Sequence, residues 1–189
     1  MRHRLIGCVH LAAVLAVFSC LAPIGAQASE PDEGAPVEIG GFVMTAPANW
    51  EKKQPRVRII EHEFAVPATE GDETDGRVTV MMAGGSIEAN LDRWYGQFKQ
   101  PDGSSSAEAA QIDEREIAGQ DVHLVDISGT YLDRRGPMAP AVERTDYRML
   151  AAIVATRGGN YYIKFYGPQK TVADNAEAFE EMIDGLKAR

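Results

Sequence analysis

The sequence predicts a single α+β domain, in which a central antiparallel sheet of about six or seven strands carries helices packed on its faces. Three features near the end of the chain lead to this prediction. The run Tyr147 to Thr156 is apolar on both strand faces over most of its length, which is typical of a strand in the middle of a covered sheet. Gly158-Gly159 then reverses the chain into a second strand, and an amphipathic helix follows.

The second strand of this hairpin, residues 161–166, alternates two kinds of side chain. Its two faces would carry Tyr161, Ile163 and Phe165 on one side and Tyr162, Lys164 and Tyr166 on the other. The first face is predicted to lie in a core. The second is amphipathic, because a lysine stem packs on apolar groups while its charge seeks polar ones.

The last helix is expected to open near Thr171, where Asp174 three residues later resembles a capping box. Its apolar residues recur at three- and four-residue steps: Val172, Ala176, Phe179, Met182, Ile183 and Leu186. This spacing places them on one stripe of the helix. We therefore predict that the helix packs back on the hairpin before it.

The earlier part of the chain predicts further strands. One runs from Val37 to Met44, with Gly40-Gly41 as a bulge or tight reversal. Another runs from Val57 to Val66, with a bulge between Ile59 and Ile60. Trp50, in the loop between them, is expected to plug a sheet edge rather than to serve as a ligand platform.

The middle of the chain predicts a strand, a helix and a hairpin in that order. The strand alternates Val78, Val80 and Met82, and Ser86 caps a helix that runs through Phe98. After a loop at 101–108, two strands at 111–117 and 121–132 form a hairpin about residues 118–120. The helices do not alternate with every strand, which favours the α+β class.

Residues 1–28 are interpreted as a secretory signal peptide, because a basic start and a short apolar run precede the small residues Ala26 and Ala28. The alternative is lipidation at Cys20 in a sequence that loosely resembles a bacterial lipobox. Residues 29–36 would form a flexible lead-in and residues 37–187 the domain. We expect a secreted or periplasmic protein, or a lipid-anchored envelope protein if Cys20 is modified.

Composition limits the classes of partner. Cleavage after Ala28 removes both cysteines, and removing Arg2 and Arg4 takes the formal charge from −9 to −11. Such an acidic chain is unsuited to nucleic acid and to anionic lipid surfaces, so contact with a membrane is expected only through Cys20. Without thiols the mature domain has no disulfides and depends on its core for stability.

His62 and His123 are the only histidines of the mature chain, and both fall on predicted strands. A zinc site needs three or four nitrogen, sulfur or carboxylate ligands, and no local spacing provides them. The two rings could still meet across the sheet, with Asp121 or Glu63 nearby. Ordinary strand histidines are favoured over a metal site, and no cofactor is expected.

Two other clusters have plain interpretations. The acidic segment 70–75 does not follow the calcium-loop pattern and is expected to be a solvated loop. Asp126 and Ser128 alternate onto the strand face opposite to His123, which argues against a catalytic triad. No catalytic constellation is found, and the chain is not expected to be an enzyme.

Partner-binding candidates are surface arginines and one connection. Arg93 is expected to project from the helix at 86–98. The connection 133–144 carries Arg134, Arg135 and Met138 between prolines, and arginine and methionine are enriched in contact surfaces. These four residues form the predicted docking set.

A family resemblance fits this order of elements. The strand that ends in Pro47-x-x-Trp50, the mid-chain helix, the long hairpin and the closing segment 161–168 followed by Phe179 and Leu186 resemble the PsbP-like α/β/α domains. These include an extrinsic photosystem II subunit, a Ran-binding protein and many bacterial envelope proteins. The resemblance covers about Val37 to Leu186 and implies binding roles without a common catalytic site.

The function expected from the sequence is a secreted or envelope-facing, non-enzymatic domain that binds an envelope or extracellular protein. The alternative is a small-molecule or metal-binding protein that uses the sheet face near His62 and His123.

Overall fold

The computed structural model describes residues 34–134, 136 and 139–189. The predicted signal peptide, with Cys8 and Cys20, and most of the lead-in lie outside the described residues. The strands are β1 (Pro36–Ile39), β2 (Phe42–Thr45), β3 (Glu51–Lys53), β4 (His62–Val66), β5 (Gly76–Ala83), β6 (Phe98–Lys99), β7 (Gln111–Ile117), β8 (Gln120–Asp133), β9 (Val142–Thr156), β10 (Gly159–Pro168) and β11 (Lys187–Ala188). The helices are α1 (Ile87–Tyr95), α2 (Ser106–Ala109), α3 (Gln169–Asp174) and α4 (Ala176–Asp184).

The predicted antiparallel sheet is confirmed, and it has eight strands rather than six or seven. Its order is β3-β4-β5-β10-β9-β8-β6, with β7 paired to β8 beside β6. Strands β1, β2 and β11 form a small second sheet. Neighbouring strands pair antiparallel throughout both sheets in the part of the chain that the structure describes.

The apolar run near the end of the chain is the central strand, as predicted. Strand β9 lies between β8 and β10, and residues 149–154 are all buried. The β9–β10 hairpin closes where Gly159 pairs with Thr156. Gly159 has a φ of 134°, a conformation that residues with a Cβ atom rarely adopt, so the glycine is needed at this point.

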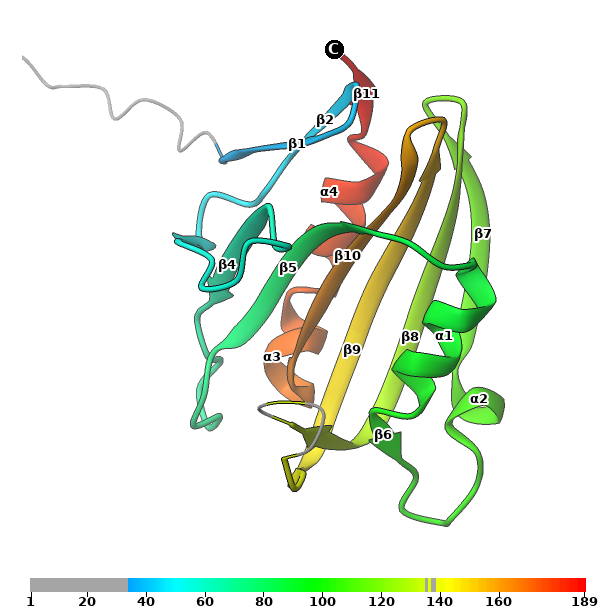
Figure 1. Ribbon diagram of the computed structural model, residues 1–189. Helices are drawn as coiled ribbons and strands as arrows, with labels where there is room; N and C mark the ends of the chain where they lie inside the picture. Colours follow the sequence, from blue (N-terminus) through cyan, green and yellow to red (C-terminus); the bar gives the residue numbers. More distant parts are fainter. Residues whose placement is uncertain (1–33, 135, 137–138) are drawn as a thin grey trace, which may run out of the picture. The chain divides into compact units, whose positions relative to one another are not determined.

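Helices flank the sheet (Figure 1), and a separate hydrophobic core lies on each of its faces. Phe165 of β10 packs against Phe179 of α4, with ring centroids 5.9 Å apart. On the opposite face, Tyr162 of the same strand meets Trp94 of α1 edge to face at 5.9 Å. The prediction that the last helical stripe covers the hairpin is confirmed.

The start of the last helical segment differs from the prediction. The segment is two helices, α3 and α4, which meet at Asn175, and α3 begins at Gln169 instead of near Thr171. Asp174 does not cap it. The Oδ2 atom of Asp72 instead accepts hydrogen bonds from the Thr171 backbone N–H at 2.9 Å and from its hydroxyl at 2.6 Å. A carboxylate from a distant loop thus occupies the position that the sequence had suggested for a local cap.

Replacing Asp72 with alanine is expected to lower the free energy of unfolding by about 1–3 kcal/mol, because two hydrogen bonds to a charged acceptor are lost beside a helix start. Urea denaturation measures the effect. Glu70→Ala, in the same loop, is the control, since only the Glu70 backbone carbonyl is engaged, by Lys170. Equal midpoints for the two variants would contradict the capping role.

Three further predictions need correction. Residues 57–61 are turn and bend rather than strand, and β4 begins only at His62. Phe98 lies in the short strand β6 rather than at the end of the helix. The predicted loop 101–108 contains the beginning of α2. Each error falls on a short segment, and β6 exists because it pairs with the distant strand β8.

Other local predictions are confirmed. Gly40-Gly41 makes the tight reversal between β1 and β2. The Ser86 hydroxyl accepts from the Ala89 N–H at the start of α1. Trp50 is buried and packs on Phe165, with ring centroids 5.4 Å apart, and so fills the core as a plug. None of the described helices is both long enough and apolar enough to span a bilayer.

Candidate functional site

The structure does not bring the two histidines together. His62 lies on β4, where its Nε2 atom is 3.0 Å from the Glu38 carbonyl oxygen. His123 lies on β8, where its Nδ1 atom is 3.2 Å from the Glu114 carboxylate. Strands β5, β10 and β9 separate them. Within residues 34–134, 136 and 139–189, no group of three or more histidine, cysteine or acidic side chains is placed to hold a metal ion.

The predicted docking arginines are partly described. The Arg93 guanidinium donates to the Asn90 side-chain oxygen at 2.7 Å. Arg134 donates to the Ala139 carbonyl at 3.3 Å, a contact within its own connection. Arg135 and Met138 lie outside the described residues. The docking role of these four residues stays a prediction.

Asp126, which the sequence places near Ser128, is engaged elsewhere. It accepts two hydrogen bonds from Arg148, at 2.9 and 2.7 Å, in a bidentate pair across β8 and β9. Hydrogen bonding to Asp126 raises the pKa of Arg148 against the opposing effect of burial. The ion pair links strands β8 and β9, and both oxygens of the Asp126 carboxylate are engaged by Arg148.

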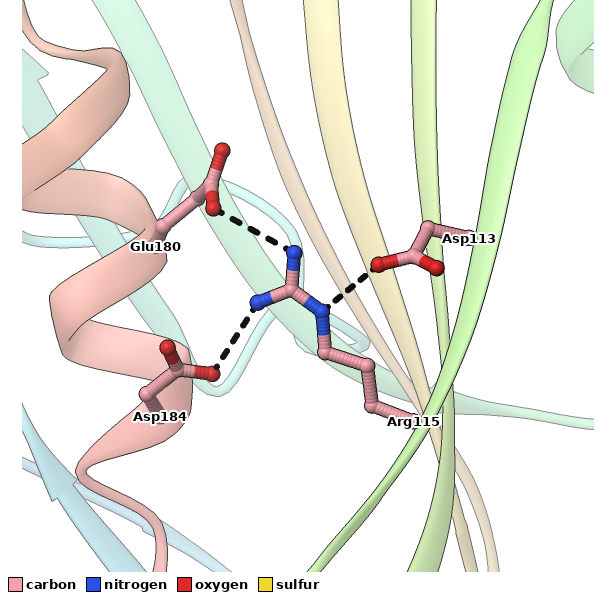
Figure 2. A network of polar contacts seen from close by, with 4 residues as sticks. All are labelled: Asp113, Arg115, Glu180 and Asp184. Atoms are coloured by element: carbon pink, nitrogen blue, oxygen red, sulfur yellow. Dashed lines mark hydrogen bonds and ion pairs between the residues drawn. The ribbon is translucent and has the colours of Figure 1, made fainter.

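A second ionic cluster ties β7 to α4 (Figure 2). The Arg115 guanidinium lies 2.6 Å from Asp113, and 3.4 Å from both Glu180 and Asp184. It stands at the side of a groove of about 220 Å³ that includes Leu124 and Leu150. The guanidinium bridges the edge strand and the helix, and its three carboxylate neighbours leave the cluster with an excess of negative charge.

The most unusual surface is the basic loop, defined as residues 54–60 between β3 and β4. Val57 is 52% exposed and Ile59 57% exposed, while Arg56 and Arg58 are also exposed. Ile60 is buried and anchors the loop, and its N–H donates to the Val57 carbonyl at 3.2 Å. The loop therefore presents two aliphatic side chains among cations in a chain whose formal charge is −9.

A cleft of about 680 Å³ opens where the beginning of the basic loop faces the sheet. Strands β4 and β5 form its floor, and its charged side chains are Lys53, Arg56, Glu63, Asp75 and Arg77. Lys53 pairs with the exposed Glu51, at 2.5 Å. Three cations and two carboxylates line the cleft, and Glu51 balances Lys53, so the cleft lacks the negative excess of the chain as a whole.

Arg77 is held rigidly at the floor of the cleft. Its Nε atom donates to Glu63 at 2.9 Å and its Nη1 atom to the Tyr166 hydroxyl at 2.8 Å. Burial alone would lower the pKa of Arg77, but the hydrogen bond to Glu63 and the interaction with Tyr166 raise it above its usual value. The guanidinium is consequently always charged, oriented by two partners, and still 42% exposed.

Beyond Tyr166, the same sheet face carries a lysine among tyrosines. The Lys164 ammonium lies 4.5 Å from the Tyr166 ring centroid and 5.2 Å from that of Tyr131, and it donates to the Gln97 side-chain oxygen. Burial, with Arg77 nearby, lowers the pKa of Lys164 to about 7. Burial also raises the pKa of Tyr131. Perturbed groups thus gather on this face beside the cleft.

Sequence reasoning missed this site for a specific reason. It assigned Val57 and Ile59 to a strand face, where they would be buried, and so gave the neighbouring arginines no role. One signal was available: the apolar phase changes between Ile59 and Ile60, and Pro55 precedes the segment. A loop explains both features without a bulge.

The sequence matches no family model and no curated protein. In structure, the chain is similar to CyanoP, the cyanobacterial PsbP of Synechocystis sp. PCC 6803, with a TM-score of 0.51, 10% identity, and coverage of 89% of this chain and 100% of that one. This likeness shows that the chain has the PsbP-like fold.

Two weaker likenesses add nothing to that conclusion. A Pseudomonas aeruginosa protein of unknown function has a TM-score of 0.46 at 12% identity, covering 83% of this chain and 98% of its own. LpqN of Mycobacterium tuberculosis, a protein involved in cell envelope biogenesis, has a TM-score of 0.44 at 11% identity, covering 82% and 84%. Identities this low are informative about fold alone.

Proposed function

We propose that this chain is an extracytoplasmic, non-enzymatic domain that binds an acidic segment of a partner protein through the basic loop. The observation that carries the proposal is the exposure of Val57 and Ile59 beside Arg56 and Arg58. The extracytoplasmic location is supported by the leader pattern of residues 1–28. The PsbP-like fold does not by itself indicate a function, so we infer the function from this surface.

The basic loop has the composition of a contact surface. Covering large aliphatic side chains with a partner is favourable, because each Å² of apolar area removed from water contributes about 25 cal/mol to the free energy of binding. Val57 and Ile59 stand two residues apart and would be covered together by one partner. Arg58 between them, with Arg56 and Lys52 nearby, supplies the polar rim that interfaces place around an apolar centre.

The distribution of charge on the chain favours a protein with an acidic segment over a lipid surface as the partner. An anionic membrane would attract the loop but repel the rest of a chain with a formal charge of −9. A short acidic segment can approach the loop without meeting that repulsion. Complementary charge would steer its approach and fix its register, while burial of the aliphatic side chains would supply affinity.

The charge reversal Arg58→Glu tests the proposal. Crosslinking in intact producing cells, followed by affinity isolation and quantitative mass spectrometry, is expected to recover on the order of tenfold less of the partner than with the unchanged chain, because a repulsive charge is placed at the rim. The same variant should fold normally, since Arg58 is exposed. Thermal unfolding of the purified protein checks this.

Arg144→Glu is the matched control and also tests the docking set predicted from the sequence. Arg144 is exposed at the beginning of β9 and is the last residue of the connection 133–144. Loss of the partner with Arg144→Glu but not with Arg58→Glu would move the docking surface to that connection. Binding of the purified chain to anionic phosphatidylglycerol vesicles, abolished by Arg58→Glu, would replace the protein partner by a membrane.

A further inference from the structure

We propose that the cleft beside the basic loop binds a carboxylate group, with Arg77 as its fixed anchor, and that the acidic segment of the partner supplies this group. The inference rests on the proposed function for the source of the carboxylate, but not for the site itself. It follows from the shape of the cleft, the state of Arg77 and the balance of charge around it.

The cleft is large enough for a side chain to enter. Its volume is about 680 Å³, and its floor is regular sheet, β4 and β5, rather than loop. Arg56 belongs both to this cleft and to the basic loop. A partner segment that covers Val57 and Ile59 therefore lies within one side chain's reach of the cleft.

Arg77 is prepared in advance for an oxyanion. Glu63 and Tyr166 hold Nε and Nη1, and among the described residues no hydrogen bond engages Nη2. The two existing bonds have already removed the rotamer freedom that an arginine loses on binding. A carboxylate that accepts from Nη2 would add a third hydrogen bond to the guanidinium, and Arg56 would add charge from the rim.

The charge balance favours a carboxylate over a phosphate group. Lys53 is paired with Glu51, which leaves Arg56 and Arg77 to face Glu63 and Asp75. The charges around the cleft are therefore balanced, and hydrogen bonding to Arg77, rather than an excess of positive charge, would hold the anion. A phosphate dianion would be repelled by the neighbouring carboxylates about twice as strongly as a single carboxylate. Glu63 is only 14% exposed, and its Oε2 atom is buried without a hydrogen-bond partner among the described residues, so it repels an approaching anion and limits how near a carboxylate can lie.

Titration calorimetry on the purified mature chain tests the inference with three probes. The first is a capped tetrapeptide with two central glutamates between leucines, the second is the same peptide with glutamines, and the third is succinate. The glutamate peptide is expected to bind on the order of tenfold more tightly than the glutamine peptide, as a charge-assisted hydrogen bond implies. Equal binding of the two peptides, or no heat from either, overturns the proposal.

Tyr166→Phe removes the hydroxyl that orients Arg77 without touching the probe. It is expected to weaken binding of the glutamate peptide severalfold and to leave binding of the glutamine peptide unchanged, because only the oriented guanidinium discriminates between them. Arg56→Ala, at an exposed position that folding does not need, should weaken the glutamate peptide as well. Arg144→Ala, outside the cleft, should change neither. Unchanged affinity in both Tyr166→Phe and Arg56→Ala overturns the assignment.

Two outcomes separate this inference from the proposed function. If succinate binds more tightly than the glutamate peptide, the bound carboxylate comes from a free dicarboxylate and not from a side chain of the partner. If recovery of the partner from cells depends on Arg58 but neither peptide binds, the carboxylate site in the cleft is wrong. The docking role of the basic loop then still holds.

Discussion

Replacing Phe179 with alanine is expected to lower the free energy of unfolding by about 3–5 kcal/mol, the range for truncation of a buried aromatic side chain. Phe179 is 2% exposed and packs on Phe165, which also contacts Trp50. The variant therefore leaves a cavity between α4 and β10, where the core on this face meets the sheet. Chemical denaturation, analysed at constant slope, measures the loss.

Ile112→Ala is the matched control for this variant. Ile112 lies on the edge strand β7 and is 45% exposed, so truncating its side chain opens no buried cavity there. Its effect is expected to stay within about 1 kcal/mol. A denaturation midpoint for Phe179→Ala that equals that of Ile112→Ala would contradict the packing of α4 on the sheet.

Lys164→Met is expected to raise stability at pH 7 by on the order of 2 kcal/mol, because it removes an ammonium that the folded state partly desolvates. The pH dependence gives the sharper test. In the folded chain the pKa of Lys164 is about 7, compared with 10.5 for the free side chain. Between these values the unfolded state binds the extra proton, so stability rises with pH.

The cost of burying Lys164 changes with pH. Below about pH 7 Lys164 is charged in both states, and the cost to the folded state is complete. Above pH 10.5 it is neutral in both, and the cost has gone. The wild-type chain should therefore gain on the order of 5 kcal/mol across this window relative to Lys164→Met.

Lys187→Met controls for the removal of one positive charge, because Lys187 is exposed on β11. Its stability should follow the wild-type curve between pH 7 and 10.5. Parallel curves for wild type and Lys164→Met over that range would show that Lys164 keeps its ordinary pKa in the folded chain.

The sequence alone predicts those elements whose hydrophobic pattern extends over many residues. Residues 147–156 carry apolar groups on both faces over their central part, and only a central strand buries both faces at once. The stripe from Val172 to Ile183 has helical spacing that any sheet face can cover. These two features placed the hairpin, the last helical segment and one of the two cores.

The elements that the sequence missed depend on distant contacts. Strand β3 is three charged residues, Glu51 to Lys53, and exists because β4 pairs with it. The start of α3 depends on Asp72, which lies 99 residues away along the chain. No local pattern encodes either partner.

The candidate site was missed for the same reason. Glu63, Arg77 and Tyr166 come from three strands, and each alone resembles an ordinary alternating position. Register brings Tyr166 opposite Arg77 on the neighbouring strand. The exposed state of Val57 and Ile59 likewise follows from where β4 begins, which pairing with β5 decides.

A photo-crosslinking amino acid placed at single positions in producing cells tests the docking loop most directly. Ile59 probes the basic loop, Val142 the connection 133–144, and Ile112 a surface without an assigned partner, and all three side chains are about half exposed. We expect one protein adduct from Ile59, reduced by Arg58→Glu, and none at the other two positions. The same adduct from all three positions, or an adduct from Val142 alone, would contradict it.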